Sequence, residues 1–166
     1  MLDVMVDQMR KASEVELYFV ALIVALALPD ICGALASDNG RASGSKYKQW
    51  VRVNMGYGEE DAANLYGFRC SLLHQGSAQP HRGDFPIAFI EPVGEAPQIH
   101  NLSTVVEDDQ VGWISIPIFV EEVADAVQRW FEEYASSTTV QRNMDRFVRR
   151  HPEGLPPHFG GAPVIA

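Results

Sequence analysis

The chain has 166 residues, of which 46% are hydrophobic and 21% charged, and its formal net charge is −9. This length and composition fit one compact domain and exclude a globally disordered protein. The negative charge argues against tight, sequence-independent binding to nucleic acid or to an anionic membrane, because both are polyanions. Cys32 and Cys70 follow no disulfide or zinc pattern, which indicates buried thiols in a reducing, cytoplasmic compartment.

A long helix is predicted over residues 2–28, which contain neither Gly nor Pro. Its second half, residues 17–28, is apolar nearly all round but shorter than the roughly 20 residues that span a bilayer. We therefore expect a buried core helix and no membrane span. Pro29 should kink or interrupt this helix, and a short helix over 30–36 would begin with Asp30 as its cap.

Residues 37–45 are polar and glycine-rich and predict a flexible loop. The run from Gly40 to Lys46 resembles a phosphate-binding loop only superficially, because its glycine spacing differs from that motif and a helix precedes it. A short helix or extended segment is expected over 47–55, followed by a turn at 56–58.

The next helix is predicted over residues 61–75. Three acidic residues just before or at its start, Glu59, Glu60 and Asp61, suit the positive end of a helix dipole. Gly76 is its natural terminator. Its apolar face should consist of Leu65, Phe68, Leu72 and Leu73.

The pattern changes after Gly76. A loop is expected over 76–86, followed by an insert at about 86–116 with three β-prone segments, residues 87–90, 99–106 and 111–116. With a turn at Asp108-Asp109, these segments predict a small antiparallel sheet of two or three strands.

The C-terminal part predicts two further helices. Residues 118–134 carry an apolar stripe at helical spacing, formed by Val120, Val123, Ala124, Val127, Trp130 and Phe131. A last helix is expected over 139–150, and the Pro- and Gly-rich tail from 152 should be irregular. The predicted fold is therefore a single, mainly α domain, a helical bundle with a small β insert.

Four residues, His74, His81, His100 and Asp84, are candidates for a metal site, but none has the spacing of zinc ligands. We expect neither a metal nor another cofactor. A Ser-His-Asp triad is equally unsupported, because no serine lies in a GxSxG motif.

Four arginines fall at i, i+4, i+7 and i+8 of the predicted last helix: Arg142, Arg146, Arg149 and Arg150. On one helix they would form a basic stripe able to contact an RNA backbone. The alternative is an ordinary exposed helix face, partly paired with Glu132, Glu133 or Asp145.

Arg69 and His74 are the most distinctive pair on the helix that ends at Gly76. Five residues separate them, so an ideal helix places them about 140° apart. Arg69 borders the apolar face, where a guanidinium needs a carboxylate, a phosphate or a neighbouring chain. In a purely structural role it would pair with an acid such as Asp30 or Glu16, and His74 would complete the helix end.

The segment GFRCSLLHQG, residues 67–76, resembles the R-x4-6-H motif of HEPN-type domains. The resemblance implies an all-α bundle that pairs as a homodimer, and in many members a metal-independent endoribonuclease of defence or toxin–antitoxin systems. It assigns phosphate binding to Arg69 and acid–base chemistry to His74, with Ser71 as a polar assistant, RNA as substrate and an antitoxin protein as partner. Cys70 departs from the polar residue that commonly follows the motif's arginine.

The leading hypothesis is therefore metal-independent RNA cleavage in a bacterial or phage defence context. The alternative is a non-catalytic HEPN-like structural or interaction domain. A small-ligand binding protein that uses the loop over 37–47 is a third hypothesis.

Overall fold

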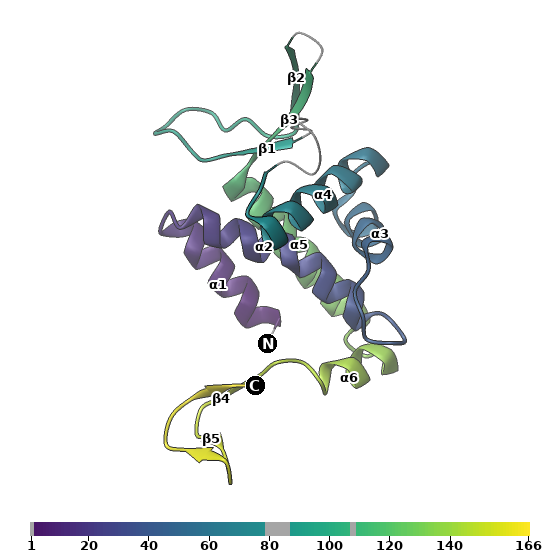
Figure 1. Cartoon of the computed structure of the whole chain (residues 1–166), viewed down its shortest axis with the longest axis vertical. Coiled ribbons are helices and arrows are strands. Elements are labelled where there is room, and N and C mark those ends of the chain that lie inside the picture. Colours follow the sequence, from purple (N-terminus) through teal and green to yellow (C-terminus); the bar gives the residue numbers. More distant parts are fainter. Residues whose placement is uncertain (1, 79–86, 107–108) are drawn as a thin grey trace.

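The computed structural model describes residues 2–78, 87–106 and 109–166. The helices in these ranges are α1 (Leu2–Glu14), α2 (Tyr18–Leu35), α3 (Gly44–Met55), α4 (Glu59–Gln75), α5 (Ile116–Tyr134) and α6 (Thr138–Met144). Helices α1, α2 and α5 pack against one another, while α3 and α4 pack beside α2. A small sheet lies at one end of the helices and the C-terminal tail at the other (Figure 1). The predicted mainly α fold with a β insert is confirmed.

Some predicted features involve residues outside these ranges. The loop expected over 76–86 is described only to residue 78, and Asp108 of the expected turn lies outside the described residues. His81 and Asp84, two of the candidate metal ligands, also lie outside them.

Helices α1 and α2 form a hairpin where one long helix was predicted, so that prediction is wrong. The chain turns at Glu16, which adopts a left-handed conformation with φ 62°. The N–H of Leu17 donates to the carbonyl of Ala12, and the N–H of Glu16 donates to that of Ser13, which together close the helix end. Glycine normally occupies this position, so the sequence carries no sign of the break.

Glu16→Gly is expected to raise the free energy of unfolding by about 0.5–1 kcal/mol, because glycine adopts the left-handed conformation without steric cost. Urea denaturation measures the change. The matched control is Glu14→Gly, which removes the same charge within the last turn of α1 and should lower stability by about 1 kcal/mol. Equal destabilisation by both variants would contradict the assignment of Glu16 as the strained residue.

Helix α2 is the central helix and contacts α1, α3, α4, α5 and α6. By length and composition alone it is apolar enough to cross a membrane, yet 56% of it is buried within the fold, as in a core helix. It also continues through Pro29 to Leu35. The interruption predicted at Pro29 is therefore wrong, because packing of a buried helix outweighs one missing backbone hydrogen bond.

All six helices of the described ranges contribute to the core, and α6 adds Val140 to the five longer helices. Each of these five contributes a side chain at most 1% exposed, namely Met9, Leu26, Val51, Leu65 and Val123. The apolar stripe predicted for the helix after the sheet is confirmed, since α5 buries all of its predicted residues except the partly buried Phe131.

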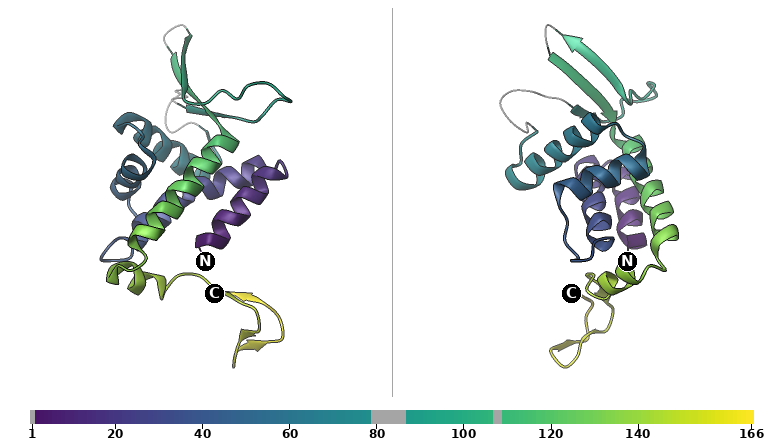
Figure 2. Two further views of the ribbon diagram at one scale, coloured as in Figure 1. Left: turned by 180° about the vertical axis from the view of Figure 1, so that it is seen from behind. Right: turned by 90° about the vertical axis from the view of Figure 1, so that its right-hand side faces the viewer.

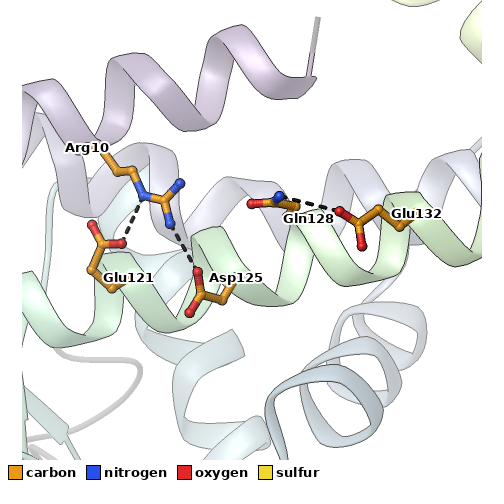
Figure 3. A network of polar contacts seen from close by, with 5 residues as sticks. All are labelled: Arg10, Glu121, Asp125, Gln128 and Glu132. Atoms are coloured by element: carbon orange, nitrogen blue, oxygen red, sulfur yellow. Dashed lines mark hydrogen bonds and ion pairs between the residues drawn. The ribbon is translucent and has the colours of Figure 1, made fainter.

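An exposed polar network joins α1 to α5 (Figure 3). Arg10 of α1 donates from Nε to Glu121 Oε2 at 2.8 Å and from Nη2 to Asp125 Oδ1 at 3.0 Å. Further along α5, Gln128 contacts Glu132. Exposed pairs of this kind contribute about 0–1 kcal/mol each, so the network orients the two helices more than it stabilises them.

The three-stranded sheet consists of β1 (Ile87–Ile90), β2 (Leu102–Val106) and β3 (Asp109–Ser115), in the order β1-β3-β2. The expected antiparallel pairing holds for β2 and β3, whereas β1 runs parallel to β3. The connection after β1 leads to β2, which lies on the other side of β3. In this arrangement Ile87 of β1 and Ile114 of β3 are both buried. The sheet stands at one end of the bundle, above α4 and the start of α5 (Figure 2).

The C-terminal segment begins with α6, which is fastened to the end of α2 by Asn143. The amide of this side chain donates to the carbonyls of Leu35 at 2.8 Å and Ser37 at 2.7 Å. The tail then forms two small antiparallel pairs where irregular chain was predicted. β4 (Arg150–His151) pairs with β7 (Val164–Ile165), and β5 (Gly154–Leu155) pairs with β6 (Phe159–Gly160).

Candidate functional site

Helix α4 carries the distinctive pair, and its limits agree closely with the prediction. It begins two residues earlier than expected, and three acidic residues lie in its first turn. It ends at Gly76, whose φ of 63° is left-handed and whose N–H donates to the carbonyl of Leu72. Leu65 and Phe68 of this helix are buried in the core. Arg69 therefore lies at the edge of the core.

Arg69 forms an ion pair with Asp30 of the central helix, through Nη2 and Oδ2. The two side chains are only 18% and 10% exposed. Burial raises the pKa of Asp30, and the nearby Arg69 guanidinium, followed by the His74 imidazole, opposes that rise. Arg69 therefore has the internal acidic partner that a structural role predicts. This partner is Asp30 rather than Glu16. Asp30 lies within α2 and does not cap a separate helix.

The same guanidinium also contacts His74. Arg69 Nη1 lies 3.4 Å from His74 Nε2, and His74 itself is exposed. The two groups therefore meet within one chain, whereas the 140° helical separation predicted that they would not. The arginine side chain is long enough to reach His74 despite this angular separation. Because arginine only donates, Nε2 accepts this hydrogen bond and the ring proton of neutral His74 lies on Nδ1.

Two tyrosines and a thiol surround the pair. Tyr47 of α3 is completely buried, and burial together with the charge of Asp30 raises its pKa. Among the described residues its hydroxyl has no hydrogen-bond partner. A hydrogen bond with Cys70 and burial raise the pKa of Tyr66, and Arg69 Nη1 lies 3.9 Å from Cys70 Sγ.

Sequence reasoning named Asp30 only as an alternative partner and did not find the tyrosines. The sequence could have indicated Asp30 as the partner of Arg69, because it is a carboxylate within the apolar helix α2. Tyr47 and Tyr66 carry no comparable signal, because their ring centroids approach to 5.3 Å only when α3 packs on α4. Gly44 permits this packing, since a Cβ there would lie 2.7 Å from the Tyr66 ring.

Ser71 is buried, with an exposed fraction of 3%. It lies on the core side of α4, away from the exposed end where His74 lies. Its position does not support the role of polar assistant.

The four C-terminal arginines do not form a stripe on one helix, so that prediction is wrong. Helix α6 ends at Met144, and the N–H groups of Arg146 and Phe147 donate to carbonyls three residues earlier as the chain turns. Phe147, beyond the end of α6, is partly buried and packs against the core. Arg142 donates to the carbonyl of Asp38, Arg149 to that of Met144, and Arg150 lies in β4.

The polar loop before α3 is held by its own hydrogen bonds. The ammonium group of Lys46 donates to the carbonyl of Arg41 at 2.7 Å and to Asn39 Oδ1 at 3.2 Å. The hydroxyl of Ser37 accepts from the N–H of Arg41. Lys46 is thus engaged by the loop itself, which supports neither a phosphate-binding loop nor the small-ligand hypothesis based on it.

His74 and His100 lie in different parts of the fold, since His100 pairs with Glu122 of α5. Within residues 2–78, 87–106 and 109–166, no three His, Cys, Asp or Glu side chains are placed to hold a metal ion.

The geometry therefore brings together a buried carboxylate, a guanidinium and an exposed imidazole, in the order Asp30, Arg69, His74. A guanidinium binds phosphate or carboxylate oxygens, and an imidazole with a free nitrogen lone pair accepts a proton. Compared with models of known protein families, with curated proteins and with solved structures, the chain has no significant match.

Proposed function

We propose that this protein is a metal-independent endoribonuclease of the bacterial or phage defence type, acting in the cytoplasm. His74 is its proton-transfer group and Arg69 binds the phosphate of the RNA. The observation that carries the proposal is the 3.4 Å contact between Arg69 Nη1 and His74 Nε2. The contact brings an anion-binding group, 18% exposed, beside an exposed acid–base group on α4.

RNA provides its own nucleophile in this reaction. The 2′-OH attacks the adjacent phosphorus and the bond to the 5′-oxygen of the next nucleotide breaks, which leaves a 2′,3′-cyclic phosphate and a 5′-hydroxyl. His74 accepts the proton of the 2′-OH at Nε2 and returns a proton to the leaving oxygen. Arg69 stabilises the negative charge that builds on the phosphate oxygens.

Asp30 has a positioning role in this proposal. Its ion pair fixes one edge of the guanidinium, so the nitrogen Nη1 remains directed toward His74. An incoming phosphate would replace His74 as the acceptor of this hydrogen bond and would free Nε2 to accept the proton.

The decisive experiment uses purified protein, single-stranded RNA of mixed sequence and excess EDTA. We expect cleavage that yields cyclic-phosphate and 5′-hydroxyl ends, and no cleavage where a 2′-deoxynucleotide replaces the attacking ribose. Cleavage of the deoxy-substituted strand, or no cleavage of RNA under any condition, would remove the basis of the proposal.

The proposal includes a homodimer and, in a toxin role, an antitoxin protein that blocks the site. Because Arg69 and His74 already meet in one chain, the second subunit is not needed to join them. It would instead place a second copy of the pair against the same RNA.

The ion pair also favours a second candidate function, a non-catalytic structural or interaction domain. Asp30 accounts for the burial of Arg69, because a buried guanidinium needs a charged partner and this carboxylate supplies one. This candidate predicts that RNA stays intact while the loss of Arg69 destabilises the fold.

A further inference from the structure

A cavity of about 300 Å³ lies where the α3–α4 connection, α5 and the sheet meet. It is separate from the pair on α4, since neither Arg69 nor His74 lines it. Met55, Leu65 and Ile114 supply part of its apolar wall. The cavity belongs to the size range of sites for small organic molecules.

Glu122 is one of the polar residues that line this cavity. Tyr57 donates its hydroxyl to Glu122 Oε2 at 2.9 Å, and His100 Nε2 lies 3.1 Å from Glu122 Oε1. Burial, followed by the negative charge of Glu122, raises the pKa of Tyr57, so Tyr57 is a neutral donor. A carboxylate has about four acceptor positions, so Glu122 is held in place with positions left for a ligand.

The charged residues in the described lining of the cavity are both carboxylates. Asp61, in the first turn of α4, is a second carboxylate in its wall. Among the described residues that line the cavity, none is Lys, Arg or His. A ligand that enters therefore meets two carboxylates, while His100, which contacts Glu122, is not among the lining residues.

Aromatic side chains complete the wall. Tyr57 and Trp113 both line the cavity. The indole N–H of Trp113 donates to Thr104 Oγ1 at 2.7 Å, so this donor is already used within the sheet. What Trp113 offers a ligand is its ring, and aromatic rings attract cations as well as apolar groups.

We propose that this cavity binds a small organic cation, a primary ammonium that carries an aromatic or aliphatic group. The ammonium donates to Glu122 and is attracted by Asp61, and its apolar part contacts Tyr57, Trp113 and Leu65. This site is independent of the proposed RNA chemistry, so either proposal can fail without the other.

Benzylammonium is the probe for this site, with benzyl alcohol as the neutral control of similar shape and benzoate as the anionic one. In titrations followed by NMR of the full chain, benzylammonium should shift the Trp113 indole and Gly112 amide signals. It should bind at least about tenfold more tightly than benzyl alcohol, as expected for a charge-assisted hydrogen bond. Equal affinity for the alcohol, or shifts confined to other surfaces, would overturn the proposal.

Three variants that each remove one negative charge test whether Glu122 and Asp61 bind the cation. Glu122→Gln should weaken benzylammonium about tenfold or more, and Asp61→Asn should weaken it about two- to fivefold as a more exposed charge. Glu60→Gln, an exposed neighbour outside the cavity, should leave the affinity unchanged. Because Asp61 is exposed, its variant tests the site even where Glu122→Gln unfolds. Equal effects of Asp61→Asn and Glu60→Gln would contradict the site.

Discussion

Substitution of His74 by glutamine is expected to slow RNA cleavage by about 10²–10⁴-fold, the usual contribution of a general acid or base. Glutamine retains a hydrogen-bonding side chain that can face Arg69, but it cannot take up a proton from the 2′-OH. His74 is exposed, so the fold should remain intact, with a thermal midpoint close to that of the wild type.

The matched control is His158→Gln in the tail, where the histidine is also exposed. It should cleave RNA at the wild-type rate. If both variants cleave as fast as the wild type, His74 has no role in catalysis, and any nuclease activity belongs to another group or to a contaminant. This comparison separates a role of His74 from a general effect of losing one imidazole.

Substitution of Arg69 by methionine is expected to lower the free energy of unfolding by about 3–5 kcal/mol at neutral pH, the usual effect of removing one partner of a buried ion pair. Methionine retains much of the length of the side chain, so the loss reports the uncompensated Asp30 carboxylate more than a cavity. The control is Arg52→Met, whose side chain is 51% exposed and lies 4.0 Å from Glu59. Its effect should stay below about 1 kcal/mol.

The pH dependence identifies the cause of this loss. Burial raises the pKa of Asp30 above its unfolded value of 3.8, so its protonated form favours the folded state. The corresponding stability is present below pH 3.8 and is lost as the pH rises through the folded pKa. Without Arg69 that pKa rises further, because its opposing positive charge is gone.

The deficit of Arg69→Met should therefore be largest at neutral pH and shrink in acid, as Asp30 takes up a proton. The double variant Asp30→Asn/Arg69→Met removes the buried charge and should recover part of the lost stability at neutral pH. Denaturation with urea at several pH values measures both effects. A deficit that is independent of pH, with no recovery in the double variant, would show that Asp30 is not the cause.

The two predictions together distinguish the candidate functions. A ribonuclease loses activity with His74→Gln and stability with Arg69→Met. A structural or interaction domain shows only the second effect. Arg69 alone cannot decide between them, because the same guanidinium pairs with Asp30 and contacts His74.

The sequence by itself determined the features that depend on local pattern. The limits of α4 and α5 followed from helical periodicity, acidic residues at the start of α4 and Gly76 at its end, which act within one or two turns. The strand segments and the mainly α fold followed in the same way. For the site, the sequence singled out Arg69 and His74 and the need of a buried guanidinium for a partner.

Only the tertiary structure decided the rest. The break at Glu16, the course of α2 through Pro29 and the early end of α6 run against local preference, because packing of the core outweighs it. The parallel pairing of β1 with β3 depends on residues far apart in the chain. The site on α4 also depends on residues far apart in the chain. Helical spacing alone separates Arg69 from His74. The position of Asp30 in a neighbouring helix and the length of the Arg69 side chain bring the three groups into contact.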